Sequence, residues 1–181
     1  RSPNPLDEGA TDRLAATVLA HGAALGVAYD GDADRAVAVD ETGARLAPDA
    51  LGALLAVHLL ERHPGAVVLY DLRASRALAE DVTAAGGLAR RTRVGHAFVK
   101  PAMRSADAVF AAELSGHYYY RDLHTTDSGL RSLIELIDLV AAADRPLSEL
   151  AAPFDRYPTS GEINVAAPSA AAASAVLAAL A

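Results

Sequence analysis

The sequence contains no cysteine, few aromatic residues and no long hydrophobic run. Without cysteine it can form no disulfide framework and perform no thiol chemistry. A membrane-spanning helix needs roughly 18 consecutive apolar residues, and no segment reaches that length. Hydrophobic residues make up 52% of the sequence, but many are alanine, which favours closely packed helices. Because no signal peptide pattern opens the chain either, we expect a cytoplasmic protein without a membrane partner.

Positive charge is also scarce. The chain has 16 lysines and arginines against 23 acidic residues, which gives a formal net charge of −7. This balance argues against nucleic acid as the main partner. It does not exclude a phosphorylated small molecule, which local arginines bind whatever the net charge is. The length of 181 residues suits one domain of good size, or one domain with parts of its neighbours.

The most informative segment is an acidic one between two apolar runs. Three aspartates stand at alternate positions, Asp30, Asp32 and Asp34, and Arg35 closes the segment. Carboxylates this close repel one another and resist desolvation, and a simple solvated turn needs only one of them. A hard divalent cation is the usual reason for such a convergence. The spacing therefore predicts a metal site, with a solvated acidic turn as the alternative.

Two known kinds of acidic loop fit this segment poorly. The aspartates and Glu41 fit an EF-hand register, but Arg35 stands where the sharp turn of that loop needs glycine. A haloacid-dehalogenase phosphatase has an Asp-x-Asp pair after a strand, but normally has Thr or Val at the place of Asp34. Two other functions stay open: a stand-alone divalent-metal-binding module, and a phosphatase that uses Asp30 as its nucleophile.

Strands and helices alternate from about residue 45 to residue 150, which predicts an α/β fold with a mostly parallel sheet and helices on both faces. Apolar strand-like runs lead directly into three polar loops, at residues 30–35, 71–76 and 113–117. In such sheets, ligands gather beyond the carboxyl ends of the strands. We therefore expect the three loops to form one site.

Several side chains in these loops suit a substrate with hydroxyl groups and an anionic group. Glu113, Ser115 and His117 are of the types that hydrogen-bond sugar hydroxyls, although Ser-Gly alone is also a common turn. Arg73 would meet a phosphate or a carboxylate, unless it pairs with a surface acid. His96 follows a glycine, and a lone histidine of this kind is as often structural.

Three further segments carry structural predictions. Residues 118–120 are all tyrosine and are expected to form a half-buried strand. The basic run at residues 90–93 is expected to be mostly solvated, because alternation along a strand sends its side chains to both faces. Ser128 is expected to cap a long helix that ends near Ala142. The apolar residues of this helix recur at helical spacing and are Leu130, Leu133, Ile134, Ile137 and Val140.

In this order the segments resemble those of the alpha-D-phosphohexomutases, the phosphomannomutase and phosphoglucomutase family. The acidic segment is similar to the family's magnesium loop, D-G-D-G/A-D-R, and residues 113–117 are similar to its sugar-selecting loop, G-E-x-S-G-H. Ala112 stands where the second pattern usually has glycine. Gly95-His96 resembles the family's Thr/Val-Gly-His segment, and Arg73 takes the place of a frequent lysine.

The resemblance implies a role for each candidate residue. Arg35 would contact a phosphate, and His96 would lie near the transferring groups. The metal would be Mg²⁺. Its ligands would be Asp30, Asp32 and Asp34, and the substrate-binding residues would be Arg73, Glu113, Ser115 and His117.

The resemblance also implies an enzyme that interconverts hexose 1-phosphate and hexose 6-phosphate, of mannose or glucose, through a phosphoserine and a hexose 1,6-bisphosphate. Of the family's four domains, residues 1–44 would end the second, 45–157 would form the third, and 158–181 would begin the fourth. Residues 3–6 and 160–164 resemble its flanking segments. The sequence contains neither the family's serine loop nor its fourth-domain phosphate loop. We therefore expect this chain alone to be inactive, with the missing domains of the same protein as its partners.

Overall fold

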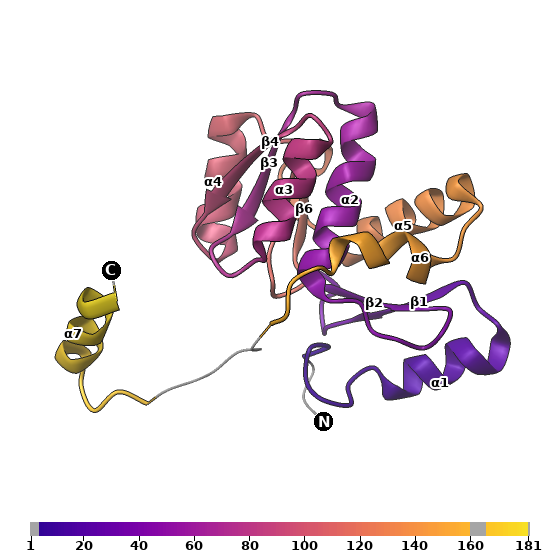
Figure 1. The fold of residues 1–181 in the computed structure, drawn as a ribbon, viewed down its shortest axis with the longest axis horizontal. Helices are drawn as coiled ribbons and strands as arrows, with labels where there is room; N and C mark the ends of the chain where they lie inside the picture. Colours follow the sequence, from indigo (N-terminus) through magenta and orange to yellow (C-terminus); the bar gives the residue numbers. More distant parts are fainter. Residues whose placement is uncertain (1–3, 160–165, 181) are drawn as a thin grey trace.

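The computed structural model describes residues 4–159 and 166–180, and Figure 1 shows its fold. The described strands form a five-stranded sheet in the order β4-β3-β5-β6-β7 and a two-stranded hairpin, β1-β2. The strands are β1 (Leu25–Tyr29), β2 (Ala36–Asp40), β3 (Val67–Asp71), β4 (Leu88–Thr92), β5 (Phe110–Ala112), β6 (Tyr118–Tyr120) and β7 (Thr126–Asp127). The helices are α1 (Asp12–His21), α2 (Pro48–Arg62), α3 (Arg76–Ala84), α4 (His96–Ala106), α5 (Gly129–Ala143), α6 (Leu147–Ala151) and α7 (Ala170–Leu180), with 3-10 turns η1 (Arg121–Leu123) and η2 (Ala152–Phe154).

The expected α/β fold is confirmed, and its larger sheet is mixed. Strand β3 is parallel to both β4 and β5, whereas β6 runs antiparallel to β5, and β7 runs antiparallel to β6. The reason is the length of the connection: the loop at residues 113–117 is too short for a crossover, so β6 returns beside β5 in the opposite direction. The three parallel strands therefore end at the edge where the polar loops lie.

Helices cover both faces of this sheet, as expected (Figure 1). Alternate residues of the strands face opposite ways, so Val68, Phe110 and Tyr120 pack with α2 and α3, whereas Leu69 and Tyr119 pack with α4. Helices on both faces also explain why the predicted half-burial of residues 118–120 is wrong. The three tyrosines of β6 are not half-buried but at most 1% exposed, because the strand lies between two others under both helical layers.

The hairpin β1-β2 carries the acidic segment at its tip. Strand β2 is buried along its whole length, and helix α1 packs its Val18 side chain close to Gly26 of β1. The other side of the hairpin meets the main core, which includes Ala36 and Ala38 of β2. Figure 1 shows α1 and α5 on opposite sides of the hairpin. The acidic segment therefore lies at the tip of a hairpin that is packed on both sides.

Helix α5 begins after Ser128, whose side chain accepts a hydrogen bond from the Arg131 N–H, as expected of a cap. The helical spacing of the apolar residues does not by itself identify the buried face. Leu130, Ile134 and Ile137 are each more than half exposed. The buried residues of the helix are Gly129, Ser132, Glu135, Leu136 and Leu139. An apolar stripe on α5 is therefore left facing solvent.

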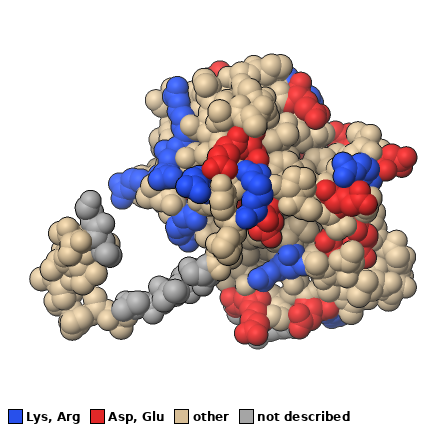
Figure 2. Space-filling view, in the orientation of Figure 1, with Lys and Arg blue, Asp and Glu red and all other residues tan. Residues whose placement is uncertain are grey.

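Other sequence predictions concern the surface and the C-terminal part. Residues 90, 91 and 93 are exposed arginines, as expected of a solvated run, and Figure 2 shows basic side chains gathered on one side of the main body. The alanine-rich C-terminal part, which the sequence favours as a helix, forms α7. The segment at 160–164, and a strand expected at 162–165, lie outside the described residues. None of the described helices is long and apolar enough to span a bilayer.

Candidate metal and substrate site

The acidic loop brings its three carboxylates together between β1 and β2. Ligand oxygens of Asp30, Asp32 and Asp34 all lie within 4.8 Å of one another. The loop turns at Ala33, which has a left-handed backbone (φ 61°). Arg35 closes the loop, because its backbone N–H donates to Asp30 Oδ1 at 3.2 Å and its Nε lies 3.0 Å from Asp30 Oδ2.

The chemistry of these carboxylates fits a hard divalent cation. Burial raises the pKa of Asp34, and a hydrogen bond and negative charge from Asp30 raise it further. Among the described residues, Asp34 Oδ1 is a buried oxygen without a hydrogen-bond partner. A cation bound by all three aspartates would remove the repulsion and satisfy this oxygen. Because every donor is a carboxylate oxygen, the set suits Mg²⁺.

We expect Asp32→Asn to weaken Mg²⁺ binding to the chain at least ~10-fold, or about 1.4 kcal/mol. The fold should not suffer, because Asp32 is exposed and its removal lessens the repulsion in the loop. Isothermal titration calorimetry with Mg²⁺ measures the affinity, and thermal unfolding measures the stability. Asp155→Asn, at another exposed aspartate, is the matched control. Equal affinities in the two variants would show that the loop is only a turn.

The loop at residues 113–117 meets the acidic loop directly. The Ala36 N–H donates to the Gly116 carbonyl at 3.0 Å, and Arg35 and His117 form an isolated antiparallel bridge. The Nε2 atom of His117 lies 3.5 Å from Asp34 Oδ2, and its Nδ1 lies 2.8 Å from Ser115 Oγ. The imidazole therefore links the acidic loop to a hydroxyl of the neighbouring loop.

Glu113 is more deeply buried than Ser115 and His117, although its Oε2 lies 3.8 Å from His117 Nδ1. It is 2% exposed, and each of its carboxylate oxygens accepts a hydrogen bond of 2.6 Å, one from the Gly95 N–H and one from the Tyr119 hydroxyl. Burial, followed by the bond to Glu113, raises the pKa of Tyr119 far above its usual value. The carboxylate therefore holds the loop before α4 against the end of β5.

The loop after β3 joins the same assembly through Asp71. The Leu114 N–H donates to Asp71 Oδ2 at 3.0 Å. A guanidinium nitrogen of Arg73 lies 3.0 Å from the same oxygen, and the Arg73 side chain is 41% exposed. The cation of this loop is therefore anchored at one point and open to solvent elsewhere.

The predicted residues thus form two groups in the structure. The acidic triad, Arg35, Ser115 and His117 form one continuous polar cluster. Arg73 and the exposed His96 lie on adjacent loops, which Asp71 and Glu113 tie to residues 113–117.

Sequence reasoning missed two other members of the site. Asp127, which directly precedes the predicted cap residue Ser128, lies within 4.8 Å of Asp34 and His117, and Lys100 pairs with it at 2.9 Å. The other is Asp71, which could have been found from the sequence because it directly follows an apolar strand-like run.

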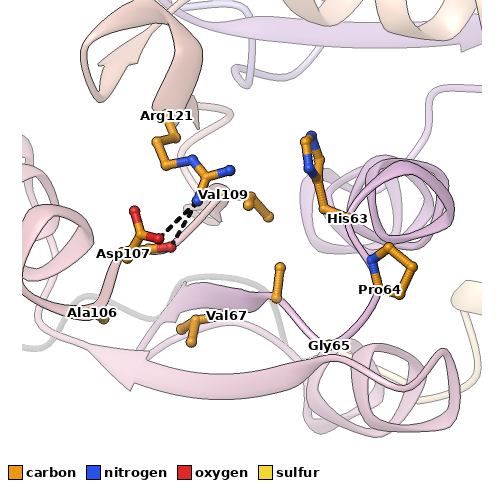
Figure 3. A pocket seen from close by; sticks show the side chains of 9 residues that line it. His63, Pro64, Gly65, Val67, Ala106, Asp107, Val109 and Arg121 are labelled. Carbon is orange, nitrogen blue, oxygen red and sulfur yellow. Dashed lines mark hydrogen bonds and ion pairs between the residues drawn. The ribbon is translucent and has the colours of Figure 1, made fainter.

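One hollow of the main body lies away from this cluster. A cavity of about 350 Å³ is lined by His63, Gly65, Val67, Asp107 and Arg121, among others, and Figure 3 shows it. These residues lie near the beginnings of β3 and β5, at the edge of the sheet opposite the polar loops. Arg121 already pairs with Asp107 at 3.0 Å. The site is therefore marked by converging polar groups and not by this cavity.

Comparisons with known proteins agree with this architecture. The family model "Phosphoglucomutase/phosphomannomutase, alpha/beta/alpha domain III" matches residues 47–157, and the model of domain II matches residues 1–43. A phosphomannomutase of Escherichia coli K12 is 41% identical over 165 residues, which cover 90% of this chain and 36% of that protein. A phosphoglucosamine mutase of Moorella thermoacetica is also 41% identical, over 81% of this chain and 34% of that protein.

A solved structure shows the same fold. A phosphoglucomutase/phosphomannomutase family protein from Burkholderia thailandensis superposes with a TM-score of 0.79 at 33% identity, over 84% of this chain and 33% of that protein. The fold is thus that of an α/β domain of phosphoglucomutases and phosphomannomutases. The chain belongs to the phosphoglucomutase/phosphomannomutase family, and it spans about a third of the length of these relatives.

Proposed function

We propose that this chain is the central part of a phosphohexomutase, in which one metal loop and one sugar-binding loop serve the same substrate. The observation that carries the proposal is the meeting of the two loops, with His117 Nε2 3.5 Å from Asp34 Oδ2. A metal-binding module alone would need no hydroxyl-binding groups beside its carboxylates. The anchored but exposed Arg73 supplies the cation that a phosphate group requires.

The proposed reaction moves a phosphoryl group between O1 and O6 of a glucose or mannose phosphate. A phosphoserine of the full-length protein gives its phosphoryl group to the free sugar oxygen, and the resulting hexose 1,6-bisphosphate returns the other phosphoryl group to that serine. Mg²⁺ held by Asp30, Asp32 and Asp34 would offset negative charge as the group moves. Arg35 contacts the transferring phosphate and His96 lies near it. Sugar hydroxyls are bound by Glu113, Ser115 and His117, and a phosphate by Arg73.

The proposed domain division follows the sequence prediction: residues 1–44 end the second domain, 45–157 form the third, and 158–181 begin the fourth. On this division the chain alone has no mutase activity, because the sequence contains no candidate for the phosphorylated serine. Catalysis of this type needs that nucleophile and a group that holds the phosphate not being transferred. The solvent-facing apolar stripe on α5 supports the proposal, since stripes of this kind are usually covered by a partner.

If the missing domains cover that stripe, the 181-residue chain should self-associate as its concentration rises. We expect Ile134→Asn with Ile137→Asn to lower the mean mass measured by light scattering after gel filtration, because both side chains are more than half exposed. Leu88→Asn is the matched control, since Leu88 is 53% exposed but lies on another element. A monomeric wild-type chain at all concentrations would contradict the expectation.

The test of the proposed function is an assay of the full-length protein with glucose 1-phosphate or mannose 1-phosphate, Mg²⁺ and a trace of hexose 1,6-bisphosphate. We expect the corresponding 6-phosphates to form without net release of phosphate. Release of inorganic phosphate alone, or a beryllium fluoride adduct on Asp30, would overturn the proposal in favour of a phosphatase. The 181-residue chain serves as the inactive control.

A further inference from the structure

Asp71 is a buried charge to which the proposed reaction assigns no part. It is the last residue of β3 and has no exposed surface. A buried carboxylate is costly unless hydrogen bonds compensate for its lost hydration. Four donors do so here. Arg73 N and Ala74 N donate to Oδ1 at 2.7 and 2.9 Å, and Leu114 N and Arg73 Nη2 donate to Oδ2, each at 3.0 Å.

The two oxygens of this carboxylate hold different parts of the site. Oδ1 fixes the backbone of its own loop, whereas Oδ2 receives both the Leu114 N–H and the Arg73 guanidinium. Leu114 precedes Ser115, so the position of Oδ2 determines where the hydroxyl-binding loop begins relative to the cation. A free arginine side chain is flexible, and holding it in one place costs conformational entropy. Because Asp71 already holds the Arg73 side chain in place, this conformational entropy is lost before the substrate binds.

We propose that Asp71 is a positioning residue, which sets the distance between the cation of Arg73 and the hydroxyl-binding groups of residues 113–117. This inference rests on the proposed function, because it requires one substrate that carries both a phosphate and hydroxyls. One of the five N–H donors of the Arg73 guanidinium bonds to Asp71 Oδ2, so the others are available to an anion. Asp71 itself faces no substrate, since it is fully buried.

The first test is Asp71→Asn in the full-length protein. The new side chain keeps one oxygen for the backbone of its own loop, but its NH₂ group faces two donors, the Leu114 N–H and the Arg73 guanidinium. We expect KM for both hexose phosphates to rise at least ~10-fold, as expected when a charged partner of a buried hydrogen bond is lost. Asp40→Asn is the matched control. Asp40 is 5% exposed, and its Oδ1 accepts three hydrogen bonds in a turn away from the site, which the amide oxygen of Asn can also accept, so this change should leave KM unchanged.

A double-mutant cycle separates positioning from a general loss of stability. If Asp71 acts through Arg73, Asp71→Asn should change KM much less in an Arg73→Met background than in the wild type. Additive effects, or a rise in KM no larger than that of Asp40→Asn, would overturn the inference. A cycle that is non-additive for Asp71 but additive for Asp40 supports it.

A second readout keeps this inference separate from the proposed function. In the 181-residue chain, hydrogen exchange of the Leu114 amide should speed up at least ~10-fold in Asp71→Asn and stay unchanged in Asp40→Asn. If the full-length protein converts no hexose phosphate, the proposed function fails, and this exchange measurement alone decides whether Asp71 orders the loop. An unchanged Leu114 amide would overturn the inference whatever the activity is.

Discussion

Gly129→Ala is expected to destabilise the chain by about 3 kcal/mol and to weaken Mg²⁺ binding more than tenfold. The change adds one methyl group at the start of α5, where glycine faces the backbone of the acidic loop. A Cβ atom there would lie 2.6 Å from the Arg35 carbonyl oxygen and 2.9 Å from that of Ala33. The Gly129 N–H also donates to the Ala33 carbonyl at 2.9 Å. The methyl group must therefore push the loop away from the helix, which moves the aspartates apart.

The sign of this effect is informative, because helix propensity alone predicts the opposite. Alanine is favoured over glycine inside a helix by about 1 kcal/mol. Gly31→Ala is the control, since a Cβ atom at Gly31 meets nothing within 4 Å and lies in the same loop. Denaturant unfolding and Mg²⁺ titration of both variants make the comparison. A Gly129→Ala variant as stable as the wild type would mean that α5 does not pack on the acidic loop.

Glu113→Ala is the second change with a large expected effect. It removes the acceptor for two donors, the Gly95 N–H and the hydroxyl of Tyr119, which is fully buried. Leaving such groups without partners costs about 1–3 kcal/mol each, so we expect a total loss near 3 kcal/mol. In the full-length protein, activity on glucose phosphate and on mannose phosphate should both decrease, because the loop is proposed to bind hydroxyls that both sugars share.

Glu113→Gln is the matched variant. Its amide oxygen can accept from the Gly95 N–H, and its NH₂ group can donate to the Tyr119 oxygen, so most of the stability should return. Denaturant unfolding of the chain compares the two variants, and the hexose phosphate assay compares their activities. Equal instability of both variants would show that the charge, and not the hydrogen bonds, holds the loop. An activity loss confined to one sugar would show that this loop discriminates between them.

Much of the fold could be predicted because local signals and tertiary context agree. The apolar runs that became β3 and β5 are buried on both faces, and a continuous hydrophobic strand is the pattern that such burial requires. The convergence of the three aspartates could be predicted because they stand at alternate positions of one short loop. These inferences needed only residues close together in the sequence.

The features that the sequence did not predict depend on contacts between distant segments. Helix α5 has two apolar stripes, and the packing of β2 and α2, not the spacing of residues, selects the one with Leu136 and Leu139 for burial. The structural role of Glu113 is equally distant in origin, because it depends on Gly95, eighteen residues earlier, donating to its carboxylate. A sequence pattern identifies the type of group in each loop, but it does not say whether that group faces a ligand or a neighbouring loop.

Paramagnetic broadening by Mn²⁺ tests most directly whether the acidic loop and residues 113–117 form one metal-centred site. Mn²⁺ prefers the same carboxylate oxygens as Mg²⁺ and broadens the NMR signals of nearby amides. We predict that Mn²⁺ broadens the amides of Gly116 and His117 as strongly as those of the acidic loop, and that excess Mg²⁺ or Asp32→Asn reverses the effect. The amides of Gly65 and Asp107, at the opposite edge of the sheet, should stay sharp. Broadening that is absent, or equal at the two edges, would contradict the account.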